Sequence, residues 1–132
     1  MASNIFDLTG KIAVVTGATG TLCSAMCYGL ADAGARVVVL ARNQDKIDTL
    51  VNTLTENGAQ ALGISTDVLN KSALQSASKQ IIDTYGRIDI LINGAGGNRS
   101  DATTMPGERS FFDLPEDAIQ WVFNLNFIGS VL

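Results

Sequence analysis

The sequence predicts an α/β protein whose parallel sheet is covered by helices on both faces, and three observations lead to this prediction. Short apolar runs without polar alternation recur along the chain, which is typical of strands buried on both faces. Segments with apolar residues at helical spacing separate these runs. The strand–helix unit repeats about every 25–30 residues, the length that a right-handed βαβ crossover needs.

The individual elements follow from the same patterns. The expected strands are residues 12–16, 36–41, 61–65 and 88–92. The first helix begins near Thr21 and is expected to bury a stripe that includes Leu22 and Met26. The second helix opens near Asn43, and the last runs from Leu114–Pro115 to the end of the chain. Glycine stops are expected after the first three helices, at Gly34, Gly58 and Gly86. This doubly wound sheet is incomplete, because a full sheet of this type has about six strands.

Composition indicates one globular domain over residues 1–132. Apolar residues make up 46% and charged residues 17% of the chain. The net charge of −4 argues against nucleic acid or an anionic membrane as partner, and no apolar run approaches the ~20 residues of a membrane span. No metal site is expected, because the chain has no histidine and only two cysteines, Cys23 and Cys27. Without a signal-peptide pattern, both thiols are expected to be reduced and the protein cytoplasmic.

The stretch from Lys11 to Cys23 carries the main functional signal, because a buried strand is followed by a glycine turn and a helix start. Glycine lets the backbone approach phosphates, and the helix start offers unpaired N–H groups and the positive end of the dipole. Taken alone, such a turn can also be only a tight connection. The residues expected to contact a dinucleotide here are Thr16, Gly17, Thr19, Gly20, Thr21 and Leu22.

The end of the second expected strand bears on the choice of cofactor. An acidic residue about 20 positions after the glycine turn selects NAD in dinucleotide folds. This position is Ala41, and Arg42 follows it. A guanidinium can make two charge-assisted bonds to a 2′-phosphate, so the pair favours NADP over NAD. The alternative is an ordinary exposed arginine at the end of a strand.

Two more strand ends carry candidate cofactor residues. Asp67 and Val68 follow the third strand, where a carboxylate can accept from an adenine amino group; the alternative is a turn or helix-capping aspartate. Asn93, Ala95 and Gly96 follow the fourth strand, where small residues let a cofactor lie against the backbone; the alternative is again a turn.

The long polar segment after the fourth strand is a candidate substrate region, because ligands bind outside the carboxyl ends of the strands in open α/β sheets. Asn98, Arg99 and Arg109 are the residues that could meet a substrate carboxylate. The alternative is that these are ordinary exposed side chains in a loop.

Together these motifs resemble the short-chain dehydrogenase/reductase family. The resemblance rests on Thr-Gly before the first helix, Asp-Val after the third strand, Asn-x-Ala-Gly after the fourth, and N-L-N-F-I-G at residues 124–129. It covers the whole chain in order and implies a Rossmann-type fold, an NAD(P) cofactor and hydride transfer between an alcohol and a ketone. The string L-I-N-G-A-G-G-N at residues 91–98 looks like the sugar-acid branch, D-mannonate oxidoreductase-like or gluconate dehydrogenase-like, which implies a sugar acid as the small-molecule substrate.

The resemblance also implies roles for single residues. Leu22 stands where the family usually has an isoleucine whose backbone reaches the pyrophosphate. Asp67 and Val68 would hold adenine, and Asn93 with its following small residues would line the adenine–ribose side. Asn126 matches the asparagine of the family's Asn-Ser-Tyr-Lys tetrad, which binds a water in a proton relay to the lysine. The alternative for Asn126 is a helix asparagine bonded to backbone.

Two departures from the family pattern concern the cofactor turn. The pattern T-G-x-x-x-G-x-G expects glycine where Thr21 and Cys23 stand, so the Cys23 side chain is expected to crowd the diphosphate or alter helix–strand packing. The second asparagine of N-N-A-G is Gly94, so the turn after the fourth strand is expected to be rearranged.

The family's catalytic Y-x-x-x-K pair and its serine are expected beyond these residues. The only tyrosines, Tyr28 and Tyr85, are followed four positions later by Asp32 and Asp89. We therefore expect the 132 residues to be the N-terminal part of a longer oxidoreductase, truncated before its catalytic Ser and Tyr-x-x-x-Lys and inactive alone. The alternative is a non-catalytic nucleotide-binding or regulatory module of the same fold.

The apolar pattern of the last expected helix indicates that it contacts another subunit. Apolar residues lie on two of its faces, and a helix of that kind is usually buried on both. In the family the equivalent helix packs against its mate in another subunit. The resemblance therefore implies a homo-oligomer, a dimer or tetramer, formed through this helix.

Overall fold

The structure, a computed structural model, describes residues 5–132 and confirms the predicted α/β class. Four parallel strands form one sheet in the order β3-β2-β1-β4. The strands are β1 (Ile12–Thr16), β2 (Arg36–Ala41), β3 (Ala61–Ser65) and β4 (Ile90–Asn93). The first three have the predicted bounds. The fourth begins two residues later than predicted, because Asp89 serves as an anchor: its carboxylate accepts a hydrogen bond from the Ile12 N–H at 2.9 Å.

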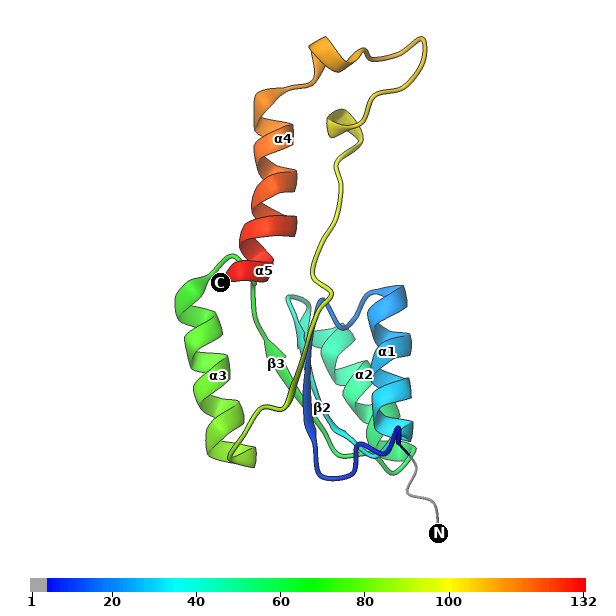
Figure 1. Cartoon of the computed structure of the whole chain (residues 1–132), viewed down its shortest axis with the longest axis vertical. Coiled ribbons are helices and arrows are strands. Elements are labelled where there is room, and N and C mark those ends of the chain that lie inside the picture. The colour runs from blue at the N-terminus through cyan, green and yellow to red at the C-terminus, as the bar shows by residue number, and fades with distance from the viewer. Residues whose placement is uncertain (1–4) are drawn as a thin grey trace.

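Helices cover both faces of the sheet, as Figure 1 shows. Helices α1 (Thr21–Asp32) and α2 (Gln44–Glu56) lie on one face, and α3 (Lys71–Tyr85) lies on the other. Consecutive residues of β2 enter opposite cores: Val37 and Val39 pack with the α1–α2 side, whereas Val38 packs with Ala77 and Ile81 of α3. This double burial explains why the central strands show no polar alternation.

Local capping fixes the helix ends, and the sequence predicts two of these caps, Asn43 and Gly86. The Asn43 side chain accepts a hydrogen bond from the Lys46 N–H at 3.0 Å and so caps the start of α2. Asn70 does the same for α3 through the Ala73 N–H. Gly86 ends α3 in the left-handed conformation, at φ 80°.

The predicted buried stripe of α1 is wrong. Leu22 and Met26 are 76% and 44% exposed, whereas Cys23 and Cys27 are the buried residues of this helix. The helix therefore faces the sheet with its small side chains, and the residues directly before them point outward. Burial, together with the nearby Cys23 thiol, raises the pKa of Cys27 to about 11. Both thiols are free, and the Cys27 thiol stays protonated at neutral pH.

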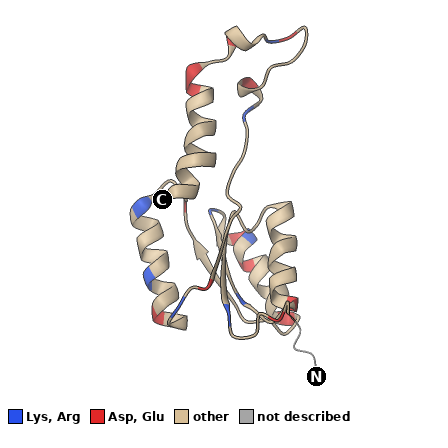
Figure 2. Ribbon diagram, in the orientation of Figure 1, with Lys and Arg blue, Asp and Glu red and all other residues tan. Residues whose placement is uncertain are grey.

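The last helical segment has nearly the predicted bounds, but a π-helical turn, which the sequence does not predict, interrupts its α-helical geometry. It consists of α4 (Glu116–Phe123), a π-helical turn η3 (Asn124–Ile128) and α5 (Gly129–Val131), with Pro115 at the N-cap. It projects beyond the carboxyl ends of the strands in Figure 1, and in the ribbon of Figure 2 its charged residues are confined to the first turn. Two short 3₁₀ turns, η1 (Ser100–Ala102) and η2 (Phe111–Asp113), lie in the segment that leads to it.

Two negative findings apply to residues 5–132. No helix there is long and apolar enough to cross a membrane. Nor do these residues contain a group of three or more side chains that could hold a metal ion.

Candidate cofactor site

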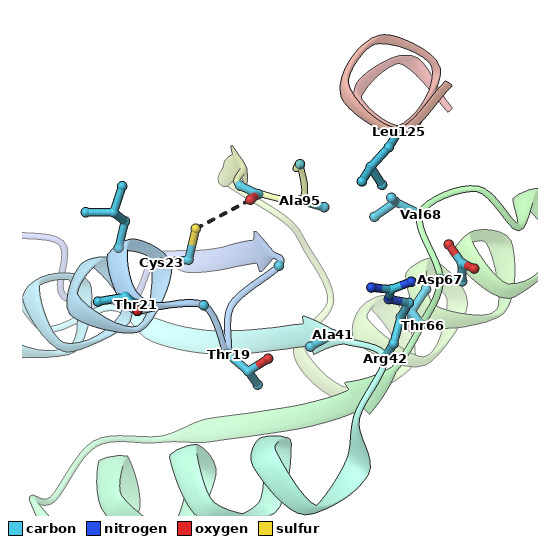
Figure 3. Close-up of a pocket in the computed structure, with 15 residues that line it drawn as sticks. Thr19, Thr21, Cys23, Ala41, Arg42, Thr66, Asp67, Val68, Ala95 and Leu125 are labelled. Atoms are coloured by element: carbon cyan, nitrogen blue, oxygen red, sulfur yellow. Dashed lines mark hydrogen bonds between the residues drawn. The ribbon is translucent and has the colours of Figure 1, made fainter. Parts of the chain in front are cut away.

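A cleft lies at the carboxyl ends of the strands, where the chain changes direction across the sheet. From β1 the chain winds outward through β2 and β3 and then returns to place β4 on the other side of β1. Such a switch point is where parallel α/β sheets bind their ligands. The cleft has a volume of about 400 Å³, and Figure 3 shows the residues that line it. These are Gly17, Thr19, Gly20, Thr21, Leu22, Cys23, Ala41, Arg42, Thr66, Asp67, Val68, Gly94, Ala95, Gly96 and Leu125.

One wall of the cleft is the N-terminus of α1. Gly20 occupies the N-cap in an extended conformation and offers no capping side chain, and the first turn holds no acidic residue. The first intrahelical bond runs from the Ser24 N–H to the Gly20 carbonyl at 2.8 Å, so the N–H groups of residues 21–23 have no acceptor within the helix. Unpaired N–H groups at the positive end of a helix dipole fit an anionic diphosphate.

The opposite wall is the backbone after β4, and Gly17 lets the two walls approach. Gly17 adopts φ +63°, a conformation that other residues rarely take. A Cβ at this position would lie 2.7 Å from the Gly94 carbonyl oxygen and 2.8 Å from the Ala95 Cα. Glycine is therefore required here for two independent reasons, the backbone angle and the lack of space.

Thr16, at the end of β1, holds the two walls together through hydrogen bonds to the backbone after β4. Its hydroxyl oxygen accepts hydrogen bonds from the Gly94 N–H at 3.1 Å and the Ala95 N–H at 3.2 Å. The same hydroxyl lies 3.5 Å from the Ile92 carbonyl oxygen, to which it donates. Thr16 is buried at the end of β1 and does not itself line the cleft. Its side chain thus holds the chain that leaves β4 against the glycine turn.

Most of the predicted cofactor residues meet in this one cleft. All of them line it except Thr16 and Asn93. Asn93 ends β4, lies opposite Thr16 in the sheet register and is exposed. The sequence reasoning missed Leu125, which reaches the cleft from the last helical segment (Figure 3). In the sequence, Leu125 belongs only to an apolar stripe of the last predicted helix, and that pattern does not show that the side chain reaches the cleft.

Arg42 and Asp67 lie at the same end of the cleft but point differently. In Figure 3 the Arg42 guanidinium is directed toward the middle of the cleft, whereas the Asp67 carboxylate lies on its outer side. The Ser65 hydroxyl donates to the Arg42 carbonyl at 3.2 Å and so fixes the backbone of that strand end. Asp67 accepts from the Leu69 N–H at 2.9 Å, so it makes the turn that was its alternative interpretation.

Asn126 binds the glycine backbone after β4. Its amide nitrogen donates to the Gly97 carbonyl at 2.7 Å and to the Val122 carbonyl at 2.8 Å, and its oxygen accepts from the Gly97 N–H at 3.1 Å. A Cβ on Gly96 would lie 2.7 Å from that oxygen. Asn126 sits in the π-helical turn, a feature that occurs frequently at functional sites. The backbone-bonded alternative for its side chain is therefore present, and its relay role stays a prediction.

Arg99 is engaged by the chain itself. It binds the Asp101 carboxylate through two nitrogens, at 2.9 and 2.5 Å, and the Asp117 carboxylate at 3.2 Å. The bonds to Asp101 raise the pKa of Arg99 above its usual range and lower that of Asp101. Arg109 donates to the Ser100 carbonyl at 2.9 Å. Arg99 thus ties the long loop to the first turn of α4, and its charge is already balanced before any substrate arrives.

A glycine turn that opens onto an uncapped helix start, at the switch point of a parallel sheet, defines a dinucleotide-binding α/β protein of the Rossmann type. The family model described as short chain dehydrogenase matches residues 11–132. The chain belongs to the short-chain dehydrogenase family, and the resemblance inferred from the motifs is confirmed.

Individual relatives agree with this assignment. The chain is 42% identical over 133 residues to an uncharacterised oxidoreductase, UxuB, from Bacillus subtilis, covering 96% of this chain and 48% of the relative. It is 43% identical over 97 residues to 2-dehydro-3-deoxy-D-gluconate 5-dehydrogenase from Formosa agariphila, covering 73% and 37%. A solved structure from Haemophilus influenza, provisionally named D-mannonate oxidoreductase and crystallised with bound NAD, matches with a TM-score of 0.86 and 35% identity, covering 95% and 48%. The chain thus spans about half the length of the first of these relatives.

Proposed function

We propose that this chain is the cofactor-binding part of an NAD(P)-dependent oxidoreductase that interconverts a hydroxyl and a ketone. The observation that carries the proposal is the uncapped start of α1 facing the glycine-rich backbone after β4 across one cleft. When bound, a nicotinamide cofactor supplies the hydride chemistry. The residues of this chain bind and orient it.

Each side of the cleft has a separate task in this proposal. The free N–H groups of residues 21–23 hold the diphosphate, and Gly17 and Gly20 keep side chains out of its path. Asp67 and Val68 meet the adenine, for which Asp67 has a second oxygen beyond the one that accepts from the Leu69 N–H. The backbone of residues 93–96 lines the ribose side. Asn126 keeps that backbone in place through its bonds to Gly97.

We favour NADP over NAD as the cofactor. Ala41 gives the end of β2 a small buried side chain with no carboxylate to accept from a ribose hydroxyl, and the Arg42 guanidinium is directed into the cleft. The Haemophilus relative was crystallised with bound NAD, so the test must compare both cofactors on this chain.

Fluorescence titration of the chain with NADPH and with NADH tests the preference. We expect Arg42→Ala to weaken NADPH binding by about tenfold, the loss of a charge-assisted contact, and to leave NADH binding within about twofold. Lys79→Ala is the matched control, since Lys79 is an exposed cation on α3 paired with Asp83. Equal affinity of the unmodified chain for NADH and NADPH would contradict the preference for NADP.

A sugar acid is the proposed substrate class. The supporting observations are the L-I-N-G-A-G-G-N string and relatives whose names contain D-mannonate and 2-dehydro-3-deoxy-D-gluconate. The acid–base residues for this chemistry are not among the 132, since neither tyrosine is followed four positions later by lysine. The prediction is therefore that the chain binds cofactor but does not turn over substrate, as measured by NADPH formation with D-mannonate or D-gluconate.

The second candidate is a non-catalytic nucleotide-binding module, which the departures at Thr21 and Cys23 favour. A relay role for Asn126 would disfavour it, whereas the bonds from Asn126 to Gly97 fit both candidates, because they hold a wall of the cleft that either would use. Cofactor binding is common to both proposals, so the two are separated by the activity of any longer protein that contains this chain. Reduction of a keto acid by that protein supports the oxidoreductase.

We also propose that the chain forms a homo-oligomer through its last helical segment, residues 116–131, and that it does so in the cytoplasm. Ile119, Phe123 and Phe127 leave apolar side chains about half exposed along one side of the projecting helix, and the two phenylalanine rings stack at 5.0 Å. Contiguous exposed apolar surface of this kind often marks a site of contact with another protein chain. Light scattering tests this: we expect a dimer or tetramer that Phe127→Lys dissociates.

A further inference from the structure

We propose that Cys23 and Gly94 form a size-matched pair that sets the spacing between the two walls of the cofactor cleft, with Cys23 as a positioning residue. The inference rests on the proposed cofactor-binding function. It concerns a contact between the first turn of α1 and the first residue after β4, two segments that line the cleft from opposite sides.

The pair is close enough for each residue to limit the other. Cys23 is 7% exposed, and its sulfur lies 3.7 Å from the Gly94 carbonyl oxygen, the contact drawn as a dashed line in Figure 3. A Cβ on Gly94 would lie 2.2 Å from that sulfur and 2.7 Å from the Thr16 carbonyl oxygen. The shorter distance is to the thiol, so the cysteine side chain already fills the space that a side chain at residue 94 would need.

The peptide between Gly94 and Ala95 is held from three directions. The Thr16 hydroxyl accepts hydrogen bonds from the Ala95 N–H of this peptide and from the Gly94 N–H of the peptide before it. The missing side chain of Gly17 lets the peptide approach, and the Cys23 sulfur closes the third side. The first turn of α1 offers N–H groups to a diphosphate, and this peptide begins the opposite wall. The separation between the walls therefore depends on the combined volume of residues 23 and 94.

This contact explains the departures from the family pattern at Cys23 and Gly94 as one change, and it does not involve the departure at Thr21. The sequence has a cysteine where the pattern expects glycine and a glycine where it expects asparagine. In the structure these two positions face each other, so volume added on α1 is matched by volume removed after β4. The Cys23 sulfur is directed at the Gly94 carbonyl, so of the two expected effects of Cys23 the structure supports altered helix–strand packing.

A double-mutant cycle on the full chain tests the pair, with Cys23→Gly, Gly94→Ala and the double variant. The readouts are NADPH affinity by fluorescence and the urea midpoint of unfolding. We expect Gly94→Ala alone to weaken NADPH binding by about tenfold. In the Cys23→Gly background we expect the same substitution to weaken it by only about threefold, because the new Cβ then meets the Thr16 carbonyl oxygen but no longer the thiol. Gly29→Ala is the control, because a Cβ at Gly29 has nothing within 4 Å and Gly29, like Gly94, does not have a positive φ.

The outcomes separate the pair from the proposed function. If the unmodified chain binds NADPH but the two substitutions act additively on its affinity, the proposal that Cys23 and Gly94 act as a pair is overturned. The proposed cofactor-binding function then stands. Coupling in the urea midpoint without coupling in affinity also overturns the positioning role, since it shows packing alone. If the unmodified chain binds neither NADPH nor NADH, both proposals fail together. Where Gly94→Ala does not fold, recovery of folding and binding in the double variant supports the pair, and failure of both variants to fold overturns it.

Discussion

Replacing Thr16 by valine removes a single hydroxyl at the junction between β1 and the backbone after β4. Valine keeps the shape and the β-branching of threonine, so strand propensity and packing change little. The Gly94 and Ala95 N–H groups lose their acceptor, and each lost bond costs about 1 kcal/mol, or up to about 3 kcal/mol if the N–H stays buried without a partner. Because both residues are only half-buried, water can replace part of the loss. We expect a decrease of about 2–3 kcal/mol in the free energy of unfolding.

Thr16→Ser is the matched control, because serine retains the hydroxyl and loses only a methyl group. Urea unfolding of the three proteins gives the comparison, with the m-value checked to be unchanged. We expect the free energy of unfolding to be highest for the unmodified chain, lower for Thr16→Ser and lowest for Thr16→Val. Weaker NADPH binding is expected only for Thr16→Val. If Thr16→Val is as stable as the unmodified chain to within about 0.5 kcal/mol, the hydroxyl does not hold the two segments together and the reasoning is refuted.

Two further predictions concern the edges of the site and sheet. The bond from the Ile12 N–H, with a contribution from Arg87, lowers the pKa of Asp89, so the folded state loses this stabilisation as pH falls from the ordinary aspartate pKa of about 3.9 through the lower folded value. In Asp89→Asn the urea midpoint of unfolding should therefore fall less steeply than in the unmodified chain as the pH is lowered through this range. An equally steep fall in both proteins would refute this. Asn126→Ala removes both the acceptor of the Gly97 N–H and the donor to the Gly97 carbonyl, so amide exchange at Gly97 should speed up by about tenfold. Unchanged exchange would mean that Asn126 does not hold this backbone.

The strand and helix bounds could be predicted because their signals are local. Asn43 and Gly86 are cap residues whose effect is complete within one helical turn, and the central strands are apolar on both faces. The start of β4 was missed because Asp89 is held by Ile12, a partner 77 positions away that no local pattern reveals.

The face that α1 buries could not be predicted from periodicity. The pattern selects the long apolar residues Leu22 and Met26, but the helix packs through Cys23 and Cys27, whose short side chains fit beside the sheet. Most of the cleft was predicted because its residues sit at the ends of consecutive strands. Leu125 and the Cys23–Gly94 contact were not, since only the fold brings those positions together.

The central claim is that the glycine turn and the start of α1 bind a nicotinamide dinucleotide. It is tested most directly by NADPH titration of the unmodified chain, Gly17→Ala and Gly10→Ala. Both glycines have positive φ, but only a Cβ at Gly17 meets other atoms, at 2.7 Å from the Gly94 carbonyl oxygen. The account predicts saturable binding by the unmodified chain and by Gly10→Ala, and loss of binding by Gly17→Ala. Absence of saturable binding in the unmodified chain, or equal binding by Gly17→Ala, would contradict it.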